Sequence, residues 1–258
     1  MANPKSAGKK RVIPPNVVNS QELENMNRKS NDLSLHPMQN ALTFLKKLKT
    51  HNNREWFESH KNDYLAARDE FLSLCDGVIG LVRKFDPRIA ADTEASACMF
   101  RIYRDIRFSK DKTPYKVHMA ASINPGGRKS ITAGYYLHVE PGASFVAGGV
   151  WMPPPPMLQA IRQEIDYEPD RLLALLKSKG FRKYFRGFDE EGRMQAAPKG
   201  YAKDHPQIEF LKNRNFIVSH NFSDKQILAK NASRQLADAF AAMHPLMEYL
   251  RQAQDHES

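Results

Sequence analysis

The spacing of apolar residues changes twice along the chain, from a helical repeat to a two-residue alternation and back to a helical repeat. Over residues 38–49 and 63–84, apolar side chains recur every three or four positions, which is typical of helices with one buried face. Asn52 and Glu55 resemble a capping box and predict the start of a short helix. The sequence therefore predicts three helices in its N-terminal third.

The middle of the chain alternates apolar and polar residues and is rich in Val, Ile, Tyr and Phe. This pattern predicts four strands, over residues 98–108, 116–123, 131–140 and 143–151. Turn sequences rich in Pro and Gly separate the last three of them. Strands that follow one another through short turns most simply form an antiparallel meander.

The helical repeat returns in the C-terminal part and predicts helices over residues 157–165, 170–179 and 205–212. Two further strand candidates are residues 181–188 and 214–220. Gly180 is expected to stop a helix, and the last long helix is predicted to begin at Ser223, which can form a capping box with Gln226. The order of elements predicts an α+β fold, with a central antiparallel meander of four or more strands flanked by N-terminal and C-terminal helices.

One folded domain, residues 37–251, is predicted between two tails. Residues 1–36 contain few apolar residues, which predicts a disordered basic tail, and residues 252–258 are assigned to a C-terminal tail. No run approaches the roughly 18 consecutive apolar residues of a membrane helix, so no membrane partner is expected. Cys75 and Cys98 provide no disulfide framework, and a cytoplasmic location is expected.

The formal net charge is +10 at pH 7, because 39 Lys and Arg residues outnumber 29 Asp and Glu residues. A basic balance favours nucleic acids, phosphates or acidic proteins as partners, without choosing among them. One markedly basic stretch is FRIYRDIRFSKDKTPYK, residues 100–116, in which cationic residues stand among aromatic and aliphatic ones. This stretch is the first candidate for a binding site.

The alternation in this stretch raises a question about Arg104. On the strand predicted over residues 98–108, the core face carries Phe100, Ile102, Ile106 and Phe108. Arg104 falls on the same face, where an unpaired guanidinium would be strongly unfavourable. Arg104 is therefore expected to pair with a carboxylate, to reach the rim of the core, to lie at a bulge, or to meet a bound anion.

The polar faces of the predicted strands gather residue types that are common in binding sites. When these faces are aligned, Arg, His and Tyr residues come to one side of the sheet, next to the basic loop that follows Phe108. We expect a phosphate-bearing or carboxylate-bearing ligand to bind there. The predicted ligand-binding residues are Arg101, Arg104, Arg107, Lys110, Lys112, Lys116, His118 and Tyr136.

His138 and Glu140 lie two positions apart on one predicted strand, so their side chains point the same way. They are the candidate catalytic residues, as a general base and its orienting carboxylate. With His118 or Asp105 they could instead hold a metal ion, but the spacing is common and no metal site is assigned. The sequence has no Walker motif, no GxGxxG and no GxSxG, and it identifies no cofactor.

Gly148 and Gly149 lie inside the strand predicted over residues 143–151. Glycine within a strand indicates either a bulge or sharp bend, or a close approach of the backbone to a ligand. Both interpretations remain open at the level of the sequence.

Four segments of the chain carry a family resemblance: NNREWFESHKNDY, FRIYRDIRFSKDKTPYK, YYLHVEPG and GGVWMP. Together they resemble the family of uncharacterised proteins called domain of unknown function 2461, over about residues 38–250. The resemblance implies a single-domain, soluble, mostly bacterial protein, and it implies no activity, substrate or catalytic residue. The family's glycine triplet corresponds here to Ala147-Gly148-Gly149, so position 147 need not be glycine.

Four functional hypotheses follow from the sequence. The leading one is binding of an anionic ligand on the basic sheet face, with or without hydrolysis of that ligand. The alternatives are a sequence-independent nucleic-acid binding module, a metal-assisted enzyme, and a structural or partner-binding role. The sequence does not decide whether the protein is an enzyme.

Overall fold

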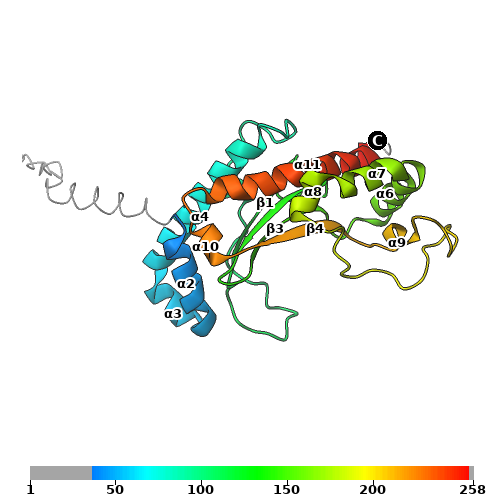
Figure 1. The fold of residues 1–258 in the computed structure, drawn as a ribbon. Helices are drawn as coiled ribbons and strands as arrows, with labels where there is room; N and C mark the ends of the chain where they lie inside the picture. Colours follow the sequence, from blue (N-terminus) through cyan, green and yellow to red (C-terminus); the bar gives the residue numbers. More distant parts are fainter. Residues whose placement is uncertain (1–36, 256–258) are drawn as a thin grey trace, which may run out of the picture. The chain divides into compact units, whose positions relative to one another are not determined.

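The computed structural model describes residues 37–255. The basic tail predicted at residues 1–36 lies outside the described residues. In the described part, helices flank one four-stranded antiparallel sheet, which confirms the predicted α+β fold (Figure 1). The last helix continues to Asp255 and so includes residues 252–255, which the sequence assigned to the C-terminal tail.

The helices that precede the sheet are α2 (Gln39–Thr50), α3 (Arg54–Ser59), α4 (Lys61–Val82) and the short α5 (Ala95–Cys98). The capping role expected for Asn52 is wrong, because Asn53 Oδ1 accepts the hydrogen bond from the Trp56 amide at 2.9 Å. Asn52 instead forms two hydrogen bonds with the backbone of Tyr115, at 2.9 and 3.1 Å. Asn52 therefore ties the turn before α3 to the segment that leads into the sheet.

The sheet consists of β1 (Met119–Ile123), β2 (Gly134–Val139), β3 (Ser144–Val150) and β4 (Phe216–Phe222). The strands lie in the order β1-β2-β3-β4, and every neighbouring pair is antiparallel. The first three strands are the last three strands of the predicted meander. The fourth corresponds to the candidate strand at residues 214–220, which the chain reaches after a long excursion through helices.

The first predicted strand, residues 98–108, is wrong. The segment makes only isolated bridges, between Met99 and Ala121 and between Tyr103 and Tyr115. The chain there folds back on itself, and the amide of Arg104 donates to the carbonyl of Pro114 at 2.9 Å. Phe108 was expected in the core but is 95% exposed, and Ile106 is only partly buried. A returning loop provides its own backbone partners, so the alternation in this segment does not produce a strand.

The helices after β3 are α6 (Pro155–Tyr167), α7 (Pro169–Lys177), α8 (Lys179–Tyr184), α9 (Ile208–Leu211), α10 (Asp224–Ile227) and α11 (Ala232–Asp255). Gly180 does not stop a helix but lies inside α8, whose N-terminus is capped by Ser178. The strand expected at residues 181–188 is also wrong, because α8 occupies its first half. The capping box of Ser223 and Gln226 is confirmed, but it starts the short α10 rather than the long α11. Among the helices of residues 37–255, none combines the length and apolar character needed to cross a membrane.

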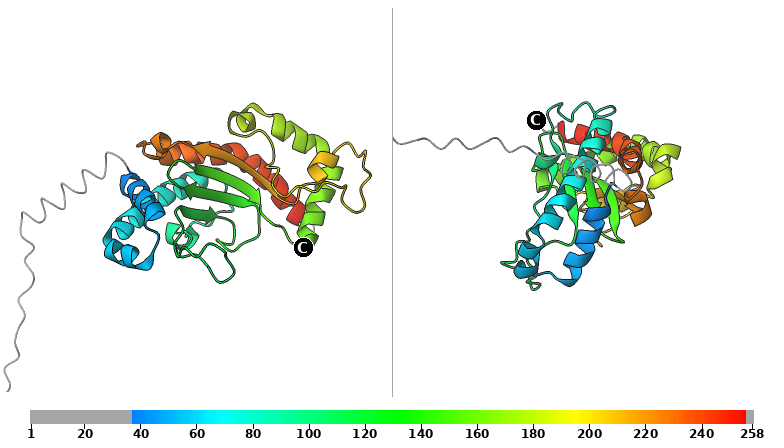
Figure 2. Two further views of the ribbon diagram at one scale, coloured as in Figure 1. Left: turned by 90° about the horizontal axis from the view of Figure 1, so that it is seen from below. Right: turned by 90° about the vertical axis from the view of Figure 1, so that its left-hand side faces the viewer.

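Helices α4 and α11 cover one face of the sheet (Figures 1 and 2). Helix α11 contacts β3 and α4, and α4 contacts β1. The sheet face under these helices carries fully buried side chains from every strand, including Ala121, Leu137, Val146 and Val218. We call the opposite face the open face. Its residues alternate with the buried ones and include Ser122, Tyr136, Ala147 and Ser219.

A buried ion pair joins α11 to the segment after α4. The Nη1 atom of Arg251 lies 2.8 Å from Oδ2 of Asp86, and both side chains are fully buried. The hydroxyl of Tyr135 donates to the same carboxylate oxygen at 2.8 Å, and Nε of Arg251 donates to the carbonyl of Ala133. These contacts fix the covered side of the sheet and leave the open face as the accessible side.

Candidate ligand-binding site on the open face

The strand register places small and polar side chains in rows across the open face. One row consists of Ser122, Tyr136, Ala147 and Ser219, and the next consists of Ala120, His138, Phe145 and Asn221. A cleft of about 750 Å³ lies over this face. Side chains along its wall include Phe100, Ser122, Asn124, Arg128, Tyr136, Phe145, Trp151, Asp189, Glu191, Ser219 and Asn221.

Positive charge gathers on the β1 side of the cleft. The guanidinium of Arg128 lies over the ring of Phe100, with its carbon 5.3 Å from the ring centroid, and the Lys116 ammonium lies 5.5 Å from the same centroid. Arg128 donates to the carbonyl of Met99, and Lys116 donates to the carbonyl of Arg101. Burial lowers the pKa of Lys116, and the positive charges of Arg101 and Arg128 lower it further.

The β4 side of the cleft carries carboxylates. The amide of Asp189 donates to the carbonyl of Ile217 at 2.8 Å, which holds this residue beside the outer strand. The hydroxyl of Ser219 donates to the Asp189 carboxylate at 3.1 Å, and Glu191 also lines the cleft. Burial raises the pKa of Asp189 above its ordinary value. The cleft is therefore basic at one edge of the sheet and acidic at the other.

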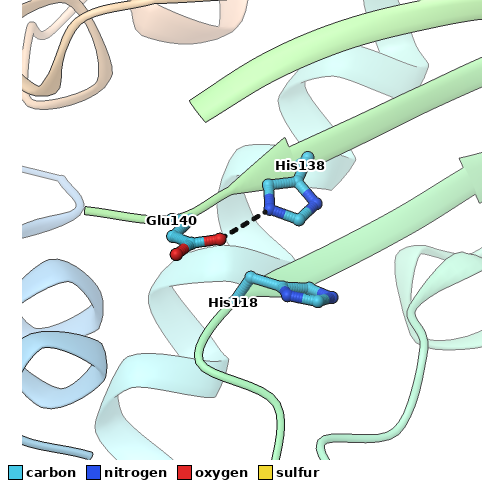
Figure 3. Close-up of side chains that lie close together, drawn as sticks. All are labelled: His118, His138 and Glu140. Atoms are coloured by element: carbon cyan, nitrogen blue, oxygen red, sulfur yellow. Dashed lines mark hydrogen bonds and ion pairs between the residues drawn. The ribbon is translucent and has the colours of Figure 1, made fainter. Parts of the chain in front are cut away.

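A cluster of two histidines and a glutamate lies beside the cleft. Figure 3 shows His138 and Glu140 at the end of β2, with His118 next to them at the start of β1. The rings of His118 and His138 have centroids 4.2 Å apart, and Nε2 of His138 lies 3.3 Å from Oε2 of Glu140. The hydroxyl of Tyr136 lies 3.2 Å from Nδ1 of His138, so Tyr136 connects the cluster to the cleft.

The surroundings of the cluster favour neutral imidazoles. Burial lowers the pKa of His118 to about 4, with smaller contributions from His138 and the positive charge of Lys116. Burial also lowers the pKa of His138, although the neighbouring Glu140 opposes this effect. Both rings are therefore largely uncharged near pH 7, and a neutral ring nitrogen can accept a proton or bind a metal ion.

Within residues 37–255, two groups of side chains have spacings suited to a metal ion. In the first, ligand atoms of His118, His138 and Glu140 all lie within 4.8 Å of one another. The second group is Asp86, His244 and Glu248. In that group Arg251 already forms ion pairs with Asp86 and Glu248, at 2.8 and 2.9 Å, so a cation occupies the place that a metal would need. The first group is the better candidate.

Several of the predicted basic residues are already neutralised. Arg104 forms an ion pair with Asp111 and also bonds to Thr113, so the carboxylate partner expected for Arg104 is Asp111. Arg107 pairs with Asp105 at 2.6 Å and projects into solvent. These contacts lower the pKa of Asp105 and of Asp111 to about 2.

The remaining loop lysines also lie away from the cleft wall. Lys112 donates to the carbonyl of Ile106 at 3.0 Å, and Lys110 is exposed. The structure thus gathers only part of the predicted set at the open face. That part consists of Lys116, His118, Tyr136, His138 and Glu140, whereas Arg101 contributes its backbone carbonyl to Lys116 and is itself exposed.

Sequence reasoning missed Arg128, Phe100 and Asp189. Arg128 directly follows the turn NPGG, which we interpreted only as the separation between two strands. A cation at a turn beside a polar strand face is a signal that could have identified this residue. Phe100 was assigned to the core, and it instead lines the cleft. No signal pointed to Asp189, because its placement depends on contact with β4, which is distant in sequence from β1 to β3.

The two glycines of β3 are explained by packing within the protein. A Cβ atom at Gly148 would lie 2.2 Å from the sulfur of Met243 in α11. Gly149 has a φ of 131°, and a Cβ atom there would lie 1.8 Å from the carbonyl oxygen of Phe216 in β4. These distances indicate that the two glycines are needed for packing and backbone geometry within the sheet. They do not require a close approach of the backbone to a ligand.

Comparison with protein families gave one match. The sequence model of the family DUF2461, described as conserved hypothetical protein, matches residues 40–249. This range includes the whole sheet, the basic loop and the histidine cluster. Comparisons with curated proteins and with solved structures gave no match.

Proposed function

The chain belongs to the DUF2461 family of conserved hypothetical proteins, and we propose that it binds a small phosphate-bearing or carboxylate-bearing molecule in the cleft on the open face. The observation that carries the proposal is the pair of cations Lys116 and Arg128 over the ring of Phe100. Within residues 37–255, neither of these two cations has a carboxylate within ion-pair distance. Unneutralised positive charge at the edge of a cleft attracts an anion.

The electrostatics of Lys116 support this placement. Burial and two neighbouring cations make its charged form less favourable, as the lowered pKa shows. An anion between Lys116 and Arg128 would offset both effects, because it supplies the opposite charge that the protein does not provide there.

The size and lining of the cleft favour a small molecule. Its volume of about 750 Å³ lies within the range of roughly 300–1,000 Å³ that is usual for small-molecule sites. Phe100, Tyr136, Phe145 and Trp151 give the wall an aromatic character, and Trp151 is 56% exposed. A ligand with a planar or apolar part next to its anionic group would use both the rings and the cations.

The proposal is tested by isothermal titration with inorganic phosphate, pyrophosphate and citrate. The test variant is Lys116→Gln with Arg128→Gln, and the matched control is Lys110→Gln with Lys112→Gln on the exposed loop. Each double variant removes two positive charges, so the net charge of the two proteins is the same. The test variant should bind the tightest anion at least about tenfold more weakly, about 1.4 kcal/mol, and the control should bind it as the wild type does.

Two results would contradict the proposal. If none of the anions binds the wild type, the cleft is not an anion site. If both double variants lose affinity equally, the whole basic surface is responsible, and the nucleic-acid alternative gains support. A steep dependence of single-stranded DNA binding on salt concentration would support that alternative further.

Two other expectations from the sequence remain predictions. Hydrolysis of the bound molecule by His138 and Glu140 is one, and the cytoplasmic location is the other. Cys75 and Cys98 are both buried free thiols, which is consistent with a reducing compartment. Cell fractionation followed by immunoblotting tests the location directly.

A further inference from the structure

We propose that His118, His138 and Glu140 form a binding site for a divalent transition-metal ion such as Zn²⁺, next to the anion-binding cleft. Two imidazole nitrogens and one carboxylate oxygen are a donor set that Zn²⁺ accepts in proteins. The inference does not depend on the proposed function, since the metal ion alone would bind to these three side chains.

The distances between the donor atoms suit such an ion. Around a tetrahedral ion with bonds of about 2.1 Å, two ligand atoms lie about 3.4 Å apart. Nε2 of His138 and Oε2 of Glu140 are 3.3 Å apart, and all three donor atoms lie within 4.8 Å of one another. Binding of all three residues to one ion requires that separations of up to 4.8 Å shorten to about 3.4 Å.

The strands hold the three residues in place. His138 belongs to β2, Glu140 follows the end of β2, and His118 precedes β1. The register pairs Met119 with Val139, so the neighbouring ends of these two strands present all three residues on one side. Because His138 lies in the sheet and His118 and Glu140 directly adjoin its paired residues, little conformational freedom of the backbone would be lost when a metal ion binds.

Further contacts orient the donor atoms. The hydroxyl of Tyr136 contacts Nδ1 of His138 and leaves its Nε2 directed at Glu140. Lys49 lies 3.5 Å from Oε1 of Glu140, and the amide of Glu140 donates to the hydroxyl of Ser144 at 3.1 Å. Partners of this kind, one step outside the ligands, are typical of metal-binding histidines and carboxylates.

A site with three protein ligands leaves at least one position on the ion for water or for a bound molecule. Tyr136 contacts Nδ1 of His138 and also lines the cleft, so one side chain separates the metal ligands from the cleft. Water or a small anion from solution is the expected outer ligand. The arrangement belongs to the class of open metal sites rather than to closed structural ones.

The test uses the full-length protein after chelation and dialysis, in a buffer free of phosphate and carboxylates. Co²⁺ is titrated and followed by its visible absorption, which reports the coordination geometry, and Zn²⁺ binding is measured by isothermal titration. We expect one ion per chain and a spectrum of four- or five-coordinate Co²⁺ with nitrogen and oxygen ligands.

Three single variants assign the ligands: His118→Gln, His138→Gln and Glu140→Gln. Each should weaken Co²⁺ binding by at least about tenfold. The control is His205→Gln, which removes another histidine paired with a carboxylate, at 2.9 Å from Asp166. It should bind Co²⁺ as the wild type does. Circular dichroism confirms that each variant is folded, and the partly exposed Glu140 keeps the test decisive if a histidine variant does not fold.

The proposal is overturned if the wild type binds no stoichiometric metal, or if folded Glu140→Gln binds it unchanged. Because the titration contains no anionic ligand, its failure leaves the anion-binding proposal intact. Conversely, a cleft that binds no anion leaves the metal titration valid.

Discussion

Replacement of Gly149 by Ala tests whether the glycine serves the sheet or a ligand. Gly149 has a φ of 131°, a conformation that costs a residue with a side chain on the order of 1–3 kcal/mol. The new Cβ would also lie 1.8 Å from the carbonyl oxygen of Phe216, so β4 would have to move away from β3. Loss of about two backbone hydrogen bonds would add about 2 kcal/mol. The free energy of unfolding should therefore fall by about 3–5 kcal/mol.

Urea unfolding followed by circular dichroism measures this change, with Gly127→Ala as the matched control. Gly127 also has a positive φ, 88°, but no atom lies within 4 Å of its added Cβ. The control should lose only about 1–2 kcal/mol, the cost of the backbone conformation. If Gly149→Ala is no less stable than the control but loses phosphate affinity, the steric reasoning is refuted, and the close-approach interpretation is correct.

Three further predictions concern the rest of the chain. Arg251→Met leaves the Asp86 carboxylate buried without its cation and should lower the free energy of unfolding by about 3–5 kcal/mol, measured in urea. The pKa of Asp111 is held at about 2, below its ordinary value, by Arg104, so the stabilising contact should persist above pH 4 and disappear only as the pH falls through 2, which carboxyl NMR shifts report. Phe108→Ser should change the unfolding free energy by less than about 0.5 kcal/mol, because this side chain is 95% exposed.

The long elements could be predicted because their patterns are local and repeated. The helices over residues 38–49 and 63–84 correspond to α2 and α4, within two residues at each end. The three strands of the meander were found because each has one buried face, which alternation reports directly. Local signals were insufficient for residues 181–188, where a helix capped by Ser178 replaces the expected strand.

The basic stretch shows why alternation alone is not enough. Residues 98–108 alternate as a strand would, but Asn52 and the returning chain hold Tyr115 and Arg104 in a loop. These partners are distant in sequence or depend on tertiary contacts, so the pattern does not contain them. The polar face that was predicted for the later strands does exist, because it depends only on the register of β1 and β2.

Net charge predicts a class of ligand but not the residues that would bind it. A cation attracts an anion only where no carboxylate of the protein already neutralises it. Arg107 pairs with a carboxylate two residues away, and Arg104 pairs with one seven residues away. The loop therefore has less free positive charge than its number of Lys and Arg residues suggests. The positive charge over Phe100 comes from Lys116 and Arg128, from segments on either side of β1, and only the folded chain brings them together.

The two cations over Phe100 are Lys116 and Arg128, and Lys116 lies close enough to the cluster of His118, His138 and Glu140 to influence it electrostatically. The positive charge of Lys116 contributes to the lowered pKa of His118, and Tyr136 connects the cluster to the cleft wall. A divalent ion held by the cluster would add positive charge at the same side of the open face as Arg128. Metal and anion would then bind with positive coupling, each raising the affinity for the other by the same factor. The covered face of the sheet can take no part in this, since α4 and α11 seal it.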